Sequence, residues 1–124
     1  MPITGLDHVQ VAAPRTPDAE EQARAFYGRL LGLQEIDKPD ALKRKGGVWF
    51  SLGAGQLHVG LEDPFTPARK AHPALSVRDL PALRALLDAH HIPISEAEPI
   101  PGVARFYVHD PFGNRIELLE TQIE

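Results

Sequence analysis

The sequence contains no cysteine, so disulfide bonds, thiolate metal ligands and cysteine nucleophiles are all excluded. Any metal ion must therefore be held by nitrogen and oxygen atoms. No stretch approaches the roughly 18 consecutive apolar residues that a membrane-spanning helix needs. Residues 1–13 show no basic leader followed by an apolar core. We therefore expect a cytoplasmic protein with no membrane partner.

A clustered basic excess is also missing, because the formal net charge is -4, and this argues against nucleic-acid binding. The local exception is Lys43-Arg44-Lys45, a run beside Gly46-Gly47 that is either solvated loop charge or a mobile lid that meets an anionic substrate. With 124 residues, 43% of them hydrophobic and 24% charged, the chain has the composition of one ordinary globular domain.

Four short segments alternate between aliphatic and polar residues, as strands do when one face is buried. Each segment places one candidate metal ligand on the face opposite its aliphatic row. The segments are 6–11, 56–62, 72–77 and 115–118, and the ligands are His8, His58, His72 and Glu117. We expect the polar faces to line a concavity, because an antiparallel sheet can be covered on one side and open on the other.

Each half of the chain is expected to begin with a strand, continue with a helix and close with further strands. The first helix begins at Thr16-Pro17-Asp18, with a capping hydroxyl and a proline at the first helical position, and stops at Gly32. The second helix opens at Asp79. The expected strands of the first half are 6–11, 33–37, 48–52 and 56–62, and those of the second are 72–77, one near Ile94, 104–109 and 115–119.

The repeat divides a single domain of residues 1–124 into module one at about 1–63, a linker at about 64–71 and module two at about 72–122. In this order His8 and His72 are equivalent, since both lie on the strand before a helix. His58 and Glu117 are equivalent too, since both lie on the last strand of a half.

With these residues placed, the chain resembles the vicinal oxygen chelate superfamily, which contains glyoxalase I, extradiol dioxygenases, fosfomycin-resistance enzymes and bleomycin-resistance proteins. The resemblance rests on the motifs LDHVQVA, FYGRLLGL, QLHVGLE, HPALSV and DPFGNRIELLE, of which the last is the most specific. It implies an α+β fold. Two βαβββ modules would pair into a cupped, incompletely closed mixed sheet with helices on the outer face.

The resemblance also implies one divalent metal ion per site (Ni, Zn, Mn, Fe or Co), bound by His8, His58, His72 and Glu117. Glyoxalase I has a glutamate at the position of His58, so the imidazole raises the net charge of the site by one. His58 is therefore either the fourth ligand or a group that supports the ligands or contacts the substrate.

Tyr107 lies directly across from Glu117 if His109 and Arg115 flank the hairpin loop. Glu117, or a hydroxide at the metal, would then transfer a proton, and Tyr107 would donate to a substrate oxygen. These two residues are the predicted catalytic pair.

Three residues are predicted to bind substrate. Arg105 would share the face of Tyr107 and could hold a carboxylate or phosphonate. Trp49 and Phe50 lie on opposite faces of one strand, and one of them is expected to wall the substrate pocket.

The sequence therefore predicts a metal-dependent glyoxalase-like enzyme, of lyase or isomerase type, acting on a small oxygenated organic substrate chelated through vicinal oxygens. Three alternatives stay open: a metal-free drug-binding protein of the bleomycin-resistance kind, a fosfomycin-type thiol transferase and an extradiol-type dioxygenase. We expect a homodimer, by analogy with relatives of this length.

Overall fold

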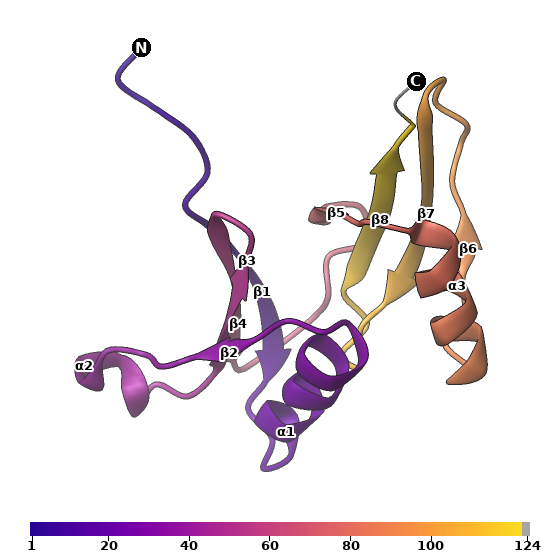
Figure 1. Ribbon diagram of the computed structural model, residues 1–124. Coiled ribbons are helices and arrows are strands. Elements are labelled where there is room, and N and C mark those ends of the chain that lie inside the picture. Colours follow the sequence, from indigo (N-terminus) through magenta and orange to yellow (C-terminus); the bar gives the residue numbers. More distant parts are fainter. Residues whose placement is uncertain (123–124) are drawn as a thin grey trace. The chain divides into compact units, whose positions relative to one another are not determined.

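A computed structural model describes residues 1–122 of the chain, which divides into two compact units, Met1–Pro67 and Ala68–Glu124 (Figure 1). We call them module 1 and module 2. The division falls after Pro67, inside the segment 64–71 that the sequence suggested as a linker.

Module 1 is built on one mixed sheet of four strands in the order β1-β4-β3-β2. Strand β1 runs parallel to β4, and the two remaining pairs are antiparallel. The elements are β1 (His8–Pro14), α1 (Ala19–Ala23), the π-helical segment η1 (Arg24–Leu30), β2 (Glu35–Ile36), α2 (Asp40–Lys43), β3 (Val48–Leu52) and β4 (Gly55–Glu62).

The helical stretch of module 1 covers the aliphatic face of this sheet. Phe50 of β3 lies with its ring centroid 5.9 Å from that of Tyr27 in η1. Apolar burial of this kind is the main source of stability for such a layer. The buried hydrophobic residues of module 1 are Val11, Ala13, Ala19, Ala23, Phe26, Tyr27, Val48, Phe50, Leu57 and Val59.

The first helix differs from its prediction at its start. It begins at Ala19, and the carbonyl oxygen of Thr16, rather than the hydroxyl, accepts from the Ala19 N–H at 3.2 Å. Asp18 makes no side-chain hydrogen bond to the helix. The predicted stop is confirmed, because Gly32 has a φ of +83°, which a residue without a Cβ adopts readily, and its N–H donates to the Gly28 carbonyl at 3.0 Å.

Module 2 has the same strand order as module 1, β5-β8-β7-β6, again with the first strand parallel to the last and the other pairs antiparallel. Its elements are β5 (Ala74–Ser76), α3 (Leu80–Ala89), β6 (Ser95–Glu96), β7 (Val103–His109) and β8 (Arg115–Thr121). The repeated order confirms the predicted α+β fold of two βαβββ modules.

Several of the predicted strands begin later in the structure. Strand β1 starts at His8 instead of residue 6, since Leu6 is 82% exposed and has no buried face to join. His72 precedes β5 instead of opening it. The short helix α2 ends at Lys43, the first residue of the run Lys43-Arg44-Lys45, and has no counterpart in the prediction.

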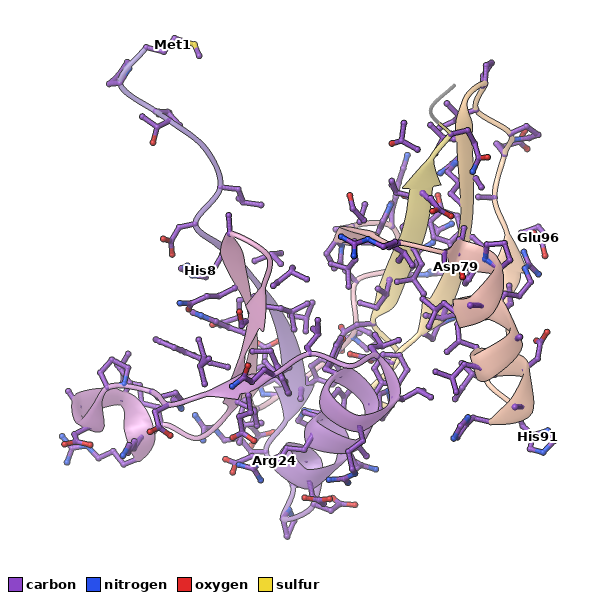
Figure 2. All side chains as sticks on the ribbon, in the orientation of Figure 1. Met1, His8, Arg24, Asp79, His91 and Glu96 are labelled. Atoms are coloured by element: carbon purple, nitrogen blue, oxygen red, sulfur yellow. The ribbon has the colours of Figure 1, made fainter. Side chains whose placement is uncertain are left out.

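Helix α3 begins at a carboxylate cap supplied by the last strand. Asp79, labelled in Figure 2, has a φ of 63°, and its own side chain accepts from the Ala82 N–H at 3.2 Å. Glu120 of β8 accepts from the N–H groups of Leu80 at 2.8 Å and Asp79 at 2.9 Å. Two carboxylates therefore satisfy N–H groups that a helix start leaves without intrahelical partners.

Replacing Glu120 by glutamine should lower the melting temperature at neutral pH and have no effect in acid. The N–H groups of Leu80 and then Asp79 hold the pKa of Glu120 below its ordinary value of 4.5. The stabilisation by this carboxylate is therefore complete above pH 4.5 and is lost as the pH falls through the lowered pKa. Thermal unfolding of both proteins across this range measures the difference.

The control for this experiment is Glu98→Gln, since the contact of Glu98 with Arg105 is made by its carbonyl oxygen. That variant should melt like the parent throughout. A difference between Glu120→Gln and the parent that persists unchanged into strong acid would contradict the capping role.

The connection between β7 and β8 is a tight turn organised by one buried carboxylate. Asp110 Oδ1 accepts from the N–H groups of Phe112 at 2.9 Å and Asn114 at 2.8 Å, and Oδ2 accepts from Asn114 Nδ2 at 2.9 Å. The turn sets the register in which His109 pairs with Arg115, and Tyr107 then pairs with Glu117. The predicted placement of Tyr107 across from Glu117 is confirmed.

Candidate functional site

The polar face of module 1 carries a stack of three aromatic rings. His8 begins β1, as Figure 2 shows, and its ring lies 4.2 Å from that of His58 at an interplanar angle of 17°. Trp49, which pairs with His58 across β3 and β4, stacks on the other side of His58 at 3.9 Å and 2°. Three strands thus hold three planar side chains in contact.

His58 is the buried member of this stack, with 4% of its surface exposed. Its Nε2 lies 2.8 Å from Gln56 Oε1, which can only accept, so Nε2 carries the hydrogen and Nδ1 the lone pair. Burial, and then the neighbouring His8, lower the pKa of His58 from its ordinary value of 6.5. A neutral imidazole is the form that binds a metal ion.

Trp49 and Phe50 are now distinguished by the strand register. Phe50 is fully buried in the apolar core beneath η1, with 0% exposure, because its side chain points away from the histidines. This corrects the inclusion of Phe50 among the substrate-binding candidates. Trp49 shares the face of His58 and keeps that candidacy.

The polar face of module 2 centres on the contact between His72 and Glu117. His72 Nε2 lies 2.8 Å from Glu117 Oε1, and Glu117 is only 7% exposed. His72 Nδ1 lies 2.9 Å from the carbonyl oxygen of Lys70. Hydrogen bonding through Nδ1 to a backbone carbonyl is the arrangement that leaves Nε2 of a histidine facing a metal ion.

The two contacts of His72 place an acceptor at each ring nitrogen. A carbonyl oxygen and a carboxylate both accept, so a neutral imidazole, which has one N–H, can satisfy only one of them. The remaining acceptor can be satisfied by a proton on either of the two side chains or by a metal ion between His72 and Glu117. The donor chemistry of this pair therefore fits a divalent metal ion.

Arg105 lies beside Glu117 with most of its donors engaged by the protein. Its guanidinium donates to the carbonyl oxygen of Glu98 from Nε at 3.1 Å and from Nη2 at 2.7 Å. Nη1 donates to the Tyr107 hydroxyl at 3.0 Å and to Glu117 Oε2 at 3.3 Å. In this structure Arg105 holds the two candidate catalytic side chains in place.

Tyr107 is enclosed by cationic and aromatic groups. The Arg115 guanidinium lies 3.7 Å from the centroid of its ring, and the ring of His72 meets it edge-on at 5.3 Å. Since the Tyr107 oxygen accepts from Arg105, its hydroxyl hydrogen stays available to donate. Sequence reasoning missed Arg115, because stacking on a ring leaves no signal in the alternation.

The two modules place equivalent residues at equivalent positions. Trp49 stands across from His58, and Tyr107 stands across from Glu117. The turn at Gly53-Ala54 pairs Leu52 with Gly55, and this pairing could have placed Trp49 from the sequence. Within either module, over residues 1–122, no three histidine or acidic side chains gather as a metal site. Each module holds two of the four candidate ligands.

The comparisons with known proteins agree with this architecture. The family model described as Glyoxalase/Bleomycin resistance protein/Dioxygenase superfamily matches residues 5–118. A Bacillus anthracis protein assigned to the glyoxalase family is 49% identical, with 96% of each chain covered and a TM-score of 0.91. None of the curated proteins matches the chain.

Two further solved structures share the fold at lower identity. Lactoylglutathione lyase from Agrobacterium tumefaciens is 21% identical, with 97% of this chain and 96% of that chain covered and a TM-score of 0.73. The fosfomycin resistance protein FosX from Listeria monocytogenes is 16% identical, with 94% and 90% covered and a TM-score of 0.75. Among residues 1–122, no helix has the length and apolar character needed to cross a membrane.

Proposed function

Because the chain belongs to the glyoxalase/bleomycin resistance protein/dioxygenase superfamily, we propose that it is a metal-dependent enzyme of glyoxalase type, a lyase or isomerase. Its substrate would be a small organic molecule with vicinal oxygens. Members of the superfamily commonly bind a divalent metal, act on small molecules and form dimers. A cytoplasmic homodimer is part of the proposal.

The contact between His72 and Glu117 carries the proposal. Two candidate ligands, His72 just before β5 and the buried Glu117 on β8, meet at 2.8 Å, and a carbonyl oxygen contacts the other ring nitrogen of His72. A metal ion would satisfy both acceptors without a second proton on the ring. His8 and His58 would supply imidazole nitrogens from the equivalent positions of module 1. These are the nitrogen and oxygen donors that a chain without cysteine can offer.

The residues around the ion would each have a separate role in binding the substrate or transferring a proton. A bound divalent ion would act as a Lewis acid toward the substrate oxygens. Glu117 would accept and return a proton, and the Tyr107 hydroxyl would donate to a substrate oxygen. Arg105 would keep both side chains in position through its contacts with Glu117 Oε2 and the Tyr107 hydroxyl. Trp49 would wall the substrate side of His58.

Metal analysis of protein purified without a histidine tag tests this function. We expect the metal-stripped chain to take up one divalent ion per chain, because each chain carries one set of four ligands. Titration with Ni, Zn, Mn, Fe and Co by calorimetry, with X-ray absorption to identify imidazole ligands, gives the stoichiometry and the preferred ion. A chain that binds none of these ions at micromolar concentration would instead be a metal-free drug-binding protein.

A further inference from the structure

Module 1 contains a hollow of about 310 Å³ that is lined in part by Trp49, one of the three stacked rings. Trp49 and Gln10 form part of its wall, and Trp49 is the residue that stacks on His58. The volume is within the range of pockets that hold small organic molecules. All of its lining residues belong to module 1, so its shape is defined within that unit.

The wall of this hollow carries positive charge without any acidic residue. Its charged residues are Arg15, Lys38 and Lys45, and we call the hollow the basic pocket. Within residues 1–122 none of the three has a carboxylate within ion-pair distance, whereas Arg24, Arg29 and Lys43 each have at least one. Uncompensated cations around one cavity are a binding site for an anion.

A second hollow of module 1 provides the contrast. It measures about 200 Å³, and its wall carries three acids, Glu20, Glu35 and Asp37, together with three cations, Arg24, Lys38 and Lys43. Arg24 donates to Glu35 at 2.9 Å, so part of this charge is already paired. Lys38 lines both hollows, but only the basic pocket has a wall without an acidic residue.

The cations of the basic pocket are anchored by backbone carbonyls. Arg15 Nη1 donates to the carbonyl oxygen of Lys45 at 3.3 Å, and Lys38 Nζ donates to that of Gly46. Neither contact neutralises a charge, because a carbonyl carries none. A guanidinium has five N–H donors and an ammonium three, so both groups keep donors for a ligand.

Gln10 adds a neutral donor to the same wall. Its side chain packs on Gly60 so closely that a Cβ there would lie 2.6 Å from Gln10 Nε2. Gly60 thus makes room for the amide. Gln10 lines the pocket together with the cations and also pairs with His58 across β1 and β4. An anion held by the cations would therefore lie next to the candidate metal ligands of module 1.

We propose that the basic pocket binds the anionic group of the substrate, a carboxylate, phosphate or phosphonate. The substrate class is then a small organic oxyanion whose uncharged oxygens face Trp49 and His58. The evidence for the pocket itself is the geometry of module 1. Only the statement that its anion belongs to the substrate rests on the proposed function.

The fluorescence of Trp49 tests the proposal, because it is the single tryptophan of the chain and lies in the wall of the pocket. The probes are inorganic phosphate, methylphosphonate and acetate, added to the full metal-stripped chain at low ionic strength, where screening is weakest. We expect a saturable change in emission for at least one probe. Higher affinity for phosphate and methylphosphonate would identify a phosphoryl ligand, and higher affinity for acetate a carboxylate.

Two variants and a control separate the pocket from general surface charge. Lys45→Gln and Lys38→Gln should each lower the affinity for the anion by about tenfold or more, since each removes a charged donor. Lys45→Gln keeps the backbone carbonyl that anchors Arg15. The control is Lys43→Gln, which removes the same charge from a residue that pairs with Asp40 at 3.1 Å. Its affinity for the anion should stay within twofold of that of the parent.

Two results would overturn the proposal. One is wild-type affinity in both pocket variants. The other is an unchanged Trp49 emission with all three probes up to about 50 mM, a concentration at which even millimolar binding would saturate. Because the protein is metal-stripped, these results do not depend on metal binding. Anion binding in a chain that takes up no metal would refute the proposed function and leave the pocket intact. Metal uptake without anion binding would refute the anion site and leave the proposed function intact.

Discussion

Replacing Glu117 by glutamine should lower the affinity of the chain for its divalent ion by at least about 100-fold, since even residues that only support a ligand cost up to this factor. The amide keeps the shape of the side chain but loses the anionic oxygen that lies 2.8 Å from His72 Nε2. Arg105 keeps its contacts with Glu98 and Tyr107, so the hairpin should remain folded. Calorimetric titration measures the affinity, and circular dichroism measures the fold.

The matched control for this substitution lies on the same strand. Glu120→Gln makes the same chemical change at a carboxylate that caps α3, and it should leave metal affinity unchanged. If Glu117→Gln bound the ion as tightly as the parent, Glu117 would not be a ligand, and its contact with His72 would be an ordinary charged hydrogen bond.

Replacing Asp110 by alanine should lower the free energy of unfolding by about 3 kcal/mol, because several charge-assisted hydrogen bonds are lost and buried donors are left without them. The N–H groups of Phe112 and Asn114 and the amide of Asn114 all donate to this carboxylate. Asp110 is 5% exposed and Asn114 8%, so water cannot easily replace the Asp110 carboxylate as the acceptor. Denaturant unfolding measures the change.

The control is Asp40→Ala, which removes an exposed carboxylate paired with Lys43 at 3.1 Å. Exposed pairs contribute about 1 kcal/mol or less, so this variant should stay close to the parent. An Asp110 variant as stable as Asp40→Ala would show that the turn forms without the carboxylate. The hairpin register that places Tyr107 across from Glu117 would then have another cause.

The faces of the strands could be predicted from the sequence, because a period of two leaves only two choices for each side chain. The alternation placed His58 opposite Leu57 and Val59, and both of those residues are buried. The turn residues from Asp110 to Asn114 fixed where β7 and β8 meet, and the pairing of Tyr107 with Glu117 followed.

Features that depend on contacts between elements could not be predicted in this way. The apolar spacing of a helix does not reveal the π-helical turns of η1, in which Phe26 and Tyr27 are buried. The alternation placed Arg105 on the face of Tyr107, but it gave no sign of the Glu98 carbonyl oxygen, which only the fold brings within reach of the guanidinium. Whether the four candidate ligands share one ion stays a prediction.

The two modules have the same strand order, so a comparison of their equivalent positions shows which different side chains this fold can carry there. At one position of the sheet it carries an imidazole in one half and a carboxylate in the other, His58 and Glu117. At the facing position it carries an indole and a phenol, Trp49 and Tyr107. Each half can therefore diverge in its reactive side chains while its backbone stays the same, and one ancestral unit can give rise to different chemistries without a new fold.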